Sequence, residues 1–497
     1  MQRLFIVLAL ILGGAAFATW KSLPHQQTEL PVLHWVTDPH PARQEQIDGF
    51  MRWLEKNDYP PMELKLDAVN NEPSKNMIQG VSGVAGEIID CYRAKRDLIL
   101  FHNLGILEDV TEEAIRLGFS PASTYPSVEA VITIDGRQYG YPRNVATFLF
   151  WVNAQAFEDL RMEAPPAVWD FDTFERIGKE FVARANADEE RGRTFFALPD
   201  QSNPMTFVTI MSRSLGLSAF NETMTASAVN DPRLVEVLER IYKWTFTDRL
   251  IPSAADRAAF TSAAGFGGAS LHLFREGRLG MLMMGRYAVT QFRRFEEPIR
   301  FSISEPPAEE FRNSLVMGAI PTVYAGGKRK DLAVYFLAYL ASEEYNRQIV
   351  RDGDGLPPNP IYTETEEFLR PPDYPNEWGV HEAFAAAARE IAIPLDHNSF
   401  ILPATVLRIQ MRAYELFLNH QIDSVEAARL MEGEINQEID RVLIERADLR
   451  ARHKKESARQ VEIEARLARD EKVPLSWISN PFHRAYYQKK GWVDPSL

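Results

Sequence analysis

The residue patterns that usually reveal enzyme chemistry are absent from this sequence. It holds no G-x-S-x-G nucleophile turn, no G-x4-G-K-[ST] phosphate loop, no H-E-x-x-H pair and no G-x-G-x-x-G segment opening a helix. The ten histidines are scattered, and none stands three or four residues from another, as two imidazoles on one helix face must to bind a metal. These absences lower the expectation of an enzyme without excluding one.

Three further segments carry weaker chemical signals. The run 265–268 (GFGG) does not have phosphate-loop spacing and predicts a loop, and 352–355 (DGDG) lacks the ligand ladder and terminal Glu of a calcium-binding EF-hand. Asp170 and Asp172 could pair for acid and base work, but Asp170 is better explained as the N-cap of the following helix. We therefore expect no catalytic residues, no cofactor and no metal.

Length and composition predict a folded, acidic protein of more than one domain. The chain has 497 residues, 45% of them hydrophobic, and a formal net charge of -14. That is enough apolar material for two cores, and the negative charge disfavours a nucleic-acid partner. Cys91 is the only cysteine, so an intramolecular disulfide and a cysteine-based metal cluster are both excluded.

The N-terminus predicts export. Arg3 precedes an uncharged run at 4–19 that ends in Ala16-Phe17-Ala18, the order of a signal peptide, and residues 1–18 are either cleaved or kept as an anchor. No cysteine lies near residue 19 to carry a lipid. We expect an extracytoplasmic protein, with the periplasm as the favoured compartment.

Hydrophobic periodicity predicts an α/β chain. Strand-like runs at 32–36, 63–69 and 87–90 alternate with helical spacing, which favours a lobe with a largely parallel sheet. Farther along, 148–153 and 301–304 are typical of extended strands, which we interpret as crossings between lobes.

The C-terminal residues change in character. Residues 440–472 are dense in charge and predict a solvated helix, and 474–497 carry aromatic rings among basic residues. This tail either packs back on the body or contacts a partner in the membrane.

Six segments, in order, carry a resemblance. They are 135–144 (DGRQYGYPRN) with 150–153 (FWVN), then 165–174 (PPAVWDFDTF), 274–281 (FREGRLGM) with 285–288 (GRYA), and 318–321 (GAIP). In this order they resemble the family-1 extracellular solute-binding proteins of ABC transporters, the group that includes the maltose-binding protein. The resemblance covers roughly residues 31–445.

The resemblance implies a two-lobed periplasmic-binding-protein fold, type II-like, of class α/β. Hinge strands join the lobes, and a C-terminal helical extension follows. Lobe 1 is expected at 31–142 and 308–360, lobe 2 at 145–300 and 361–445, and the charged extension at 446–497. Closure on a ligand between lobes gives a shape that a transporter can recognise.

The resemblance also places candidate ligand contacts in the cleft between the lobes. Asp38, after the first strand, is placed to accept ligand hydroxyls, although a turn or capping role is the alternative. Tyr92 and Arg93 offer a ring face and a fork of donors, and Asn144 at the hinge offers an amide that donates and accepts.

Further contacts are expected in the second lobe and near its borders. Tyr287 corresponds to the family's aromatic position and could stack under a sugar ring, with Arg286 beside it. The weaker correspondences are Gln201, Asn203 and Asp354. For each of these positions a structural role is the alternative.

Together these features predict a receptor that passes a small polar ligand, expected to be a saccharide or sugar derivative, to an ABC import permease. We expect a monomer. Because Arg93, Arg143 and Arg286 lie near the expected cleft, an anionic sugar stays as open as a neutral one. An exported carbohydrate or ester hydrolase and a receptor for a membrane sensor are the alternatives.

Overall fold

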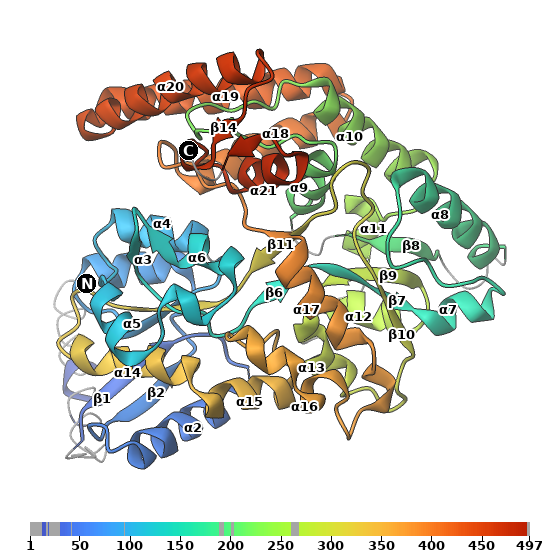
Figure 1. Ribbon diagram of the computed structural model, residues 1–497. Coiled ribbons are helices and arrows are strands. Elements are labelled where there is room, and N and C mark those ends of the chain that lie inside the picture. The colour runs from blue at the N-terminus through green and yellow to red at the C-terminus, as the bar shows by residue number, and fades with distance from the viewer. Residues whose placement is uncertain are drawn as a thin grey trace, which may run out of the picture.

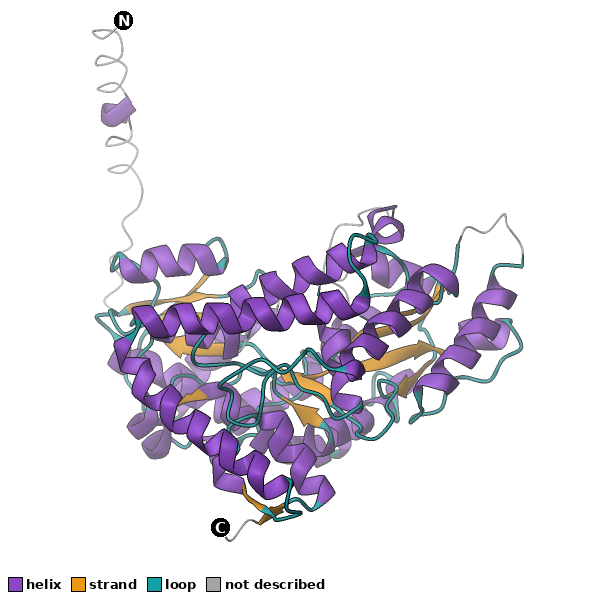
Figure 2. Cartoon of the chain, turned by 90° about the horizontal axis from the view of Figure 1, so that it is seen from above, coloured by secondary structure: helices purple, strands orange, loops and turns teal. Residues whose placement is uncertain are grey.

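The protein consists of two α/β lobes side by side, with C-terminal helices lying along one edge of both (Figure 1). The computed structural model describes residues 12–15, 18, 30–40, 42–93, 95–187, 193–199, 203–259 and 268–494. Most of the expected leader, 1–18, and the candidate Gln201 therefore lie outside the described residues. Seen from above, strands lie inside the body and helices cover them (Figure 2).

Lobe 1 is built around a four-stranded sheet in the order β12-β3-β1-β2. Strands β1, β2 and β3 are parallel and β12 runs antiparallel beside β3, which confirms the expected, largely parallel arrangement. Its strands are β1 (Val32–Val36), β2 (Glu63–Asp67), β3 (Ile88–Cys91) and β12 (Ile320–Val323). Its helices are α2 (Ala42–Lys56), α3 (Pro73–Val81), α4 (Lys95–Asn103), α5 (Thr111–Leu117), α6 (Pro126–Ile132), α14 (Lys330–Ala341) and α15 (Glu343–Asp352), and a hairpin joins β4 (Thr133–Ile134) to β5 (Arg137–Gln138).

The core of lobe 1 follows from the amphipathic pattern of α2. Ile47, Phe50 and Leu54 recur at helical spacing and are buried, with Phe50 edge-on to Phe336 of α14 at 5.3 Å between ring centroids. Packing of aromatic edges against faces stabilises such a helix against the sheet.

Lobe 2 is built around the mixed sheet β10-β7-β9-β8. Asp170 is the N-cap of helix α8 (Phe171–Ala185), as its sequence context predicts. Its side chain accepts the backbone N–H of Thr173 at 2.7 Å. The strands are β7 (Leu149–Asn153), β8 (Phe195–Leu198), β9 (Leu279–Met284) and β10 (Phe301–Ser304). The helices are α7 (Ala154–Asp159), α8 (Phe171–Ala185), α9 (Met205–Ser214), α10 (Pro232–Tyr242), α11 (Ala254–Ala259), α12 (Gly268–Arg275) and α13 (Val289–Phe292).

The lobes are joined by a separate small sheet in the order β13-β11-β6. These strands are β6 (Ala146–Thr147), β11 (Ser314–Met317) and β13 (Ala392–Ile393), and α16 (Glu366–Leu369) and α17 (Val380–Glu390) precede β13. The runs 148–153 and 301–304 are instead β7 and β10 of the lobe 2 sheet, so their interpretation as crossings is wrong. A crossing strand and a central strand are both enclosed on two faces, and the same apolar run suits either.

The C-terminal tail packs back on the body, as one of the two expectations held. The last helices of lobe 2 are α18 (Pro403–Leu418) and α19 (Ser424–Glu445). The tail that follows contains α20 (Ala447–Leu467), β14 (Val473–Pro474), α21 (Pro481–Lys490) and β15 (Val493–Asp494). Phe482 and Tyr486 of α21 pack with Phe311 and with Ile393 of the junction strand β13. Within the described residues no helix is both long and apolar enough to cross a bilayer.

One asparagine fixes α21 to lobe 2. The buried Asn480 amide donates to Ser218 Oγ and to the Phe220 carbonyl, each at 2.9 Å, and its Oδ1 accepts the backbone N–H of Phe482 at 2.9 Å. The side chain therefore caps the helix and satisfies a buried carbonyl at the same time.

We predict that Asn480→Ala lowers the free energy of unfolding by about 2–3 kcal/mol, because buried partners lose their hydrogen bonds and α21 loses its cap. Urea denaturation monitored by tryptophan fluorescence measures this. Gln488→Ala, on the exposed face of the same helix, is the control and should change stability by less than about 0.5 kcal/mol. Equal losses in both variants would contradict this role of Asn480.

Candidate functional site

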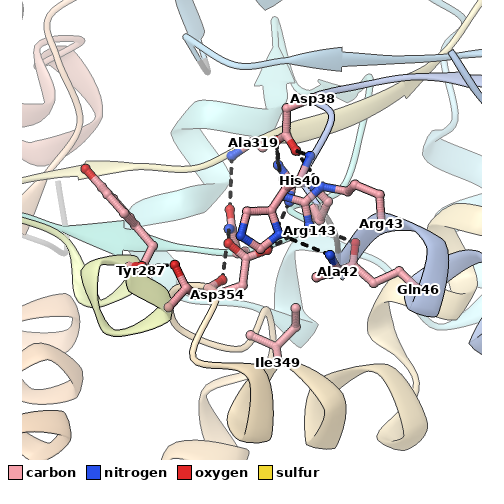
Figure 3. Close-up of polar contacts among 12 residues, drawn as sticks. Asp38, His40, Ala42, Arg43, Gln46, Arg143, Tyr287, Ala319, Ile349 and Asp354 are labelled. Carbon is pink, nitrogen blue, oxygen red and sulfur yellow. Dashed lines mark hydrogen bonds and ion pairs between the residues drawn. The ribbon is translucent and has the colours of Figure 1, made fainter. Parts of the chain in front are cut away.

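The loop after β1 carries an acid that two arginines hold in place (Figure 3). Asp38 accepts two hydrogen bonds from Arg43, from Nε at 3.0 Å and Nη2 at 3.1 Å, and a third from Arg143 Nη2 at 3.3 Å. Arg43 lies on the first turn of α2, and Arg143 comes just before β6. The forked contact sets the position of the loop 37–40 relative to the junction between the lobes.

The same arginines reach two other buried acids. Arg143 lies 3.3 Å from Asp90 Oδ2 and 3.1 Å from Asp354 Oδ2, and Arg43 Nη1 donates to Asp354 Oδ2 at 2.8 Å. Three acids, Asp38, Asp90 and Asp354, thus face two guanidinium groups, and burial raises the pKa of Asp90. We call these five residues the acid–arginine cluster.

Four of the predicted site residues meet in or beside this cluster. Tyr92 donates its hydroxyl to Asp38 Oδ2 at 2.8 Å. Asn144 donates to the Asp354 carbonyl at 2.9 Å and accepts the backbone N–H of Ala319 at 3.3 Å. Residues far apart in the sequence are thus assembled at the edge of lobe 1 where the chain crosses to lobe 2.

Asp38 stays ionised but has little accepting capacity left. Burial alone raises the pKa of its carboxyl, yet the charges of Arg143 and Arg43 outweigh burial and hold that pKa well below its usual range. Its side chain is 27% exposed, against 8% for Asp354, so it is the more accessible of the two acids. Because two arginines, Tyr92 and the His40 backbone N–H already donate to it, its main effect is to order the loop.

His40, which the sequence did not single out, adds an unused polar atom at this edge. Its Nδ1 accepts the Ala42 backbone N–H at 3.2 Å, which leaves the proton on Nε2, and Nε2 is buried without a hydrogen-bond partner among the described residues. A lone histidine in a proline-flanked loop has no sequence signal that would have found it.

Arg286 and Tyr287 follow β9 on the short helix η4 (Arg286–Ala288), and they differ in environment. Arg286 is 1% exposed, donates to His381 Nδ1 at 2.9 Å and to the Gly355 carbonyl at 2.6 Å, and so braces the turn after α15 from inside. Tyr287 is partly buried, and Figure 3 places it on the Asp354 side of the cluster. Of the two, only Tyr287 has a surface to offer a ligand.

The remaining candidates lie apart from the cluster. Arg93 is 41% exposed and pairs with Asp97 at 3.1 Å on the first turn of α4. Asn203 precedes α9, and its Oδ1 accepts the Met205 backbone N–H at 3.1 Å. The structure therefore brings together Asp38, Tyr92, Asn144 and Asp354, and leaves Arg93 and Asn203 elsewhere along the edges of the lobes.

Two hollows lie along the line where the lobes meet, and His397 lines both. One, of about 870 Å³, opens between α4 and α6 of lobe 1, the strand β13 and the C-terminal helices. The other, of about 90 Å³, lies between Arg96 of lobe 1 and the lobe 2 residues around Asn203. Within the described chain no group of three or more His, Cys, Asp or Glu is arranged to hold a metal.

Two lobes joined by short crossing strands, with polar side chains gathered at the facing strand ends, define the class of two-lobed binding proteins. A model of the bacterial extracellular solute-binding protein family matches residues 94–376, more than half of the chain. The chain belongs to this family. Among curated proteins none matches the sequence.

Solved structures agree on the fold at low sequence identity. An ABC substrate-binding protein from Listeria monocytogenes in complex with cycloalternan has a TM-score of 0.66 at 20% identity, covering 82% of this chain and 98% of its own. A solute-binding protein from Thermotoga lettingae bound to α-D-tagatose has 0.67 at 13%, covering 82% and 100%. The maltose/maltodextrin-binding domain from Bdellovibrio bacteriovorus bound to maltotriose has 0.62 at 16%, covering 83% and 99%.

One acid beside the cluster, Asp352, has an environment that disfavours its ionised form. Asp352 is the last residue of α15, and its buried Oδ2 has no hydrogen-bond partner among the residues that the structure describes. Burial, with the charges of Glu45 and Asp354, raises its pKa from 3.8 to about 6. Since the folded state binds this proton more tightly than the unfolded state, stability is lost as the pH rises from about 4 to above 6.

We predict that Asp352→Asn raises the free energy of unfolding by about 2 kcal/mol at pH 7.5, because the variant carries no charge there, and leaves it nearly unchanged at pH 4. Urea denaturation at the two pH values measures the difference. The exposed Asp373→Asn is the control and should show no such pH dependence. An equal effect at both pH values would show that ionisation of Asp352 is not the cause.

Proposed function

We propose that this protein is an extracytoplasmic receptor that binds a carbohydrate or sugar derivative and delivers it to an ABC import permease. The observation that carries the proposal is the family match over 94–376. The proposed role is binding alone, with neither a catalytic group nor a cofactor. A saccharide receptor needs no chemistry beyond a shaped, polar cleft and a hinge.

The chemistry along the facing edges suits a sugar. Tyr287 offers an aromatic ring, and the edge of lobe 1 offers His40 Nε2, which has no hydrogen-bond partner among the described residues. Pyranose rings present apolar faces that stack on aromatic rings and hydroxyl groups that exchange hydrogen bonds with polar side chains. The solved relatives with cycloalternan, α-D-tagatose and maltotriose all carry carbohydrates, which supports the same class here.

The proposal also includes the location, the lobe boundaries and the oligomeric state of the protein. Export through residues 1–18 supports a periplasmic location, either as a free protein or on an uncleaved anchor. We place lobe 1 at 31–142 and 308–360, lobe 2 at 145–300 and 361–445, and the extension at 446–497. In this proposal the protein acts as a monomer, and the permease recognises its closed form.

Binding is tested by thermal shift and calorimetric titration of the purified protein against mono- and oligosaccharides, polyols and sugar phosphates. A ligand of the folded state raises the melting temperature, because it binds the native form alone. No shift and no heat from any carbohydrate would overturn the proposal. Accumulation of hydrolysis products would replace it with the hydrolase alternative.

For the carbohydrate that binds, we predict that Tyr287→Ala raises the Kd by about 10- to 100-fold, because a stacked ring contributes about 1–3 kcal/mol. Calorimetric titration of both proteins measures this. Tyr362→Ala is the control, since Tyr362 is also partly buried against the same apolar cluster but lies outside the facing edges. Equal affinities for the wild type and Tyr287→Ala would remove Tyr287 from the site.

A further inference from the structure

A small pocket closes where α4 of lobe 1 meets lobe 2. Its volume is about 90 Å³, which suits one compact chemical group. Arg96 is its lobe 1 wall. The lobe 2 side supplies Asn203 and Thr206 at the start of α9, the segment 395–398 after β13, and Gln410 of α18. A ligand group in this pocket would be held by both lobes at once.

The charges around the pocket do not balance. Asp396 is the carboxylate among the described lining residues. Its charge is balanced by Arg213 at 2.6 Å, and it accepts a hydrogen bond from the Ser218 hydroxyl at 2.5 Å. Arg96 has neither an ion pair nor a side-chain hydrogen bond within the described parts of the chain. Its neighbour Lys95 donates to the Thr133 carbonyl and has no ion-pair partner there either. Neither cation is therefore in an ion pair within the described residues, although the charges of Asp135 and Asp97 act on Lys95 and Arg96, respectively.

His397 also lines the pocket, near enough to both cations for their charges to act on it. Burial, together with the charges of Lys95, Arg96 and Arg213, lowers its pKa to about 3, so the ring is neutral at physiological pH. It makes no hydrogen bond to any described residue. A neutral imidazole with a free N–H remains a donor for a ligand oxygen.

Two helix N-termini add partial positive charge to the pocket. Helices α9 and α18 both begin at the pocket, at Met205 and Pro403, and neither has an acidic residue in its first turn. The amino end of a helix carries partial positive charge, which favours an anion, although the first N–H of α9, that of Met205, is already donated to Asn203 Oδ1. These dipoles act in the same sense as the unpaired guanidinium of Arg96.

We propose that this pocket binds an anionic group, a carboxylate or a phosphate, carried by the solute, with Arg96 as its ion-pair partner across the cleft. This inference rests on the proposed carbohydrate receptor and specifies its ligand as an acidic or phosphorylated sugar. The arginines that the sequence offered for this task are otherwise engaged. Arg143 is paired in the acid–arginine cluster and Arg286 braces buried backbone, so neither can select an anion.

The test uses the full chain and a calorimetric titration with matched sugars: hexoses, the corresponding hexuronates and the corresponding hexose 6-phosphates. We expect at least one charged member to bind ten-fold or more tightly than its neutral parent. Carboxylate and phosphate are told apart by which arm binds. Because the contact is ionic, its advantage should shrink as salt rises from 20 to 500 mM.

Arg96→Gln should remove that advantage and leave the affinity for the neutral sugar unchanged. Its melting temperature should not fall, since no ion pair is lost. Arg116→Gln, an exposed arginine of lobe 1, is the matched control and should keep the advantage. If neutral sugars bind and charged ones bind no better, the inference is overturned while the receptor function stands. If no sugar binds, the receptor function itself fails.

Discussion

Full pairing of the buried charges in the acid–arginine cluster is the constraint on which the geometry of the site depends. Burying a guanidinium or a carboxylate costs several kcal/mol, and that cost is recovered only when every charge has close partners. Arg143 is fully buried and has three acids around it, and Arg43 has two. A shift of the loop after β1, of the residues before β6 or of the turn after α15 would leave one of these charges unpaired. The edge of lobe 1 is therefore defined at its junction with lobe 2.

The cluster also decides which groups a ligand can use. Its internal pairing occupies the acceptors of Asp38 and the two terminal nitrogens of Arg143, groups that residue type alone would assign to the ligand. What remains for recognition are groups at its border, the His40 Nε2 and the Tyr287 ring, and the unpaired Arg96 in the pocket. Ligand recognition is thus left to side chains that are not paired within the acid–arginine cluster.

The sequence predicted most of the fold because local rules govern it. Periodicity identified α2, the spacing around Asp170 identified a helix cap, and ordered family segments identified two lobes. The acid–arginine cluster could not be predicted from the sequence. Arg43 and its partner Asp354 are 311 positions apart, and neither belongs to a recognisable motif in its own segment. Arg96 was missed for the same reason. Only the meeting of α4 with the segment 395–398 shows that Arg96 lines a pocket and forms no ion pair within the described part of the chain.

The C-terminal extension, residues 446–497, is attached much more strongly to lobe 2 than to lobe 1. Its aromatic cluster packs on Phe311 and on β13, and Asn480 bonds to lobe 2, so these buried contacts tie it to lobe 2 and the junction. Towards lobe 1 a hollow of about 870 Å³ intervenes, and among the described residues one ion pair, Arg452 with Asp135 at 3.0 Å, spans it. Both side chains are exposed, and such a pair contributes at most about 1 kcal/mol. The extension therefore belongs with lobe 2, and its attachment to lobe 1 is too weak to hold the lobes at one angle.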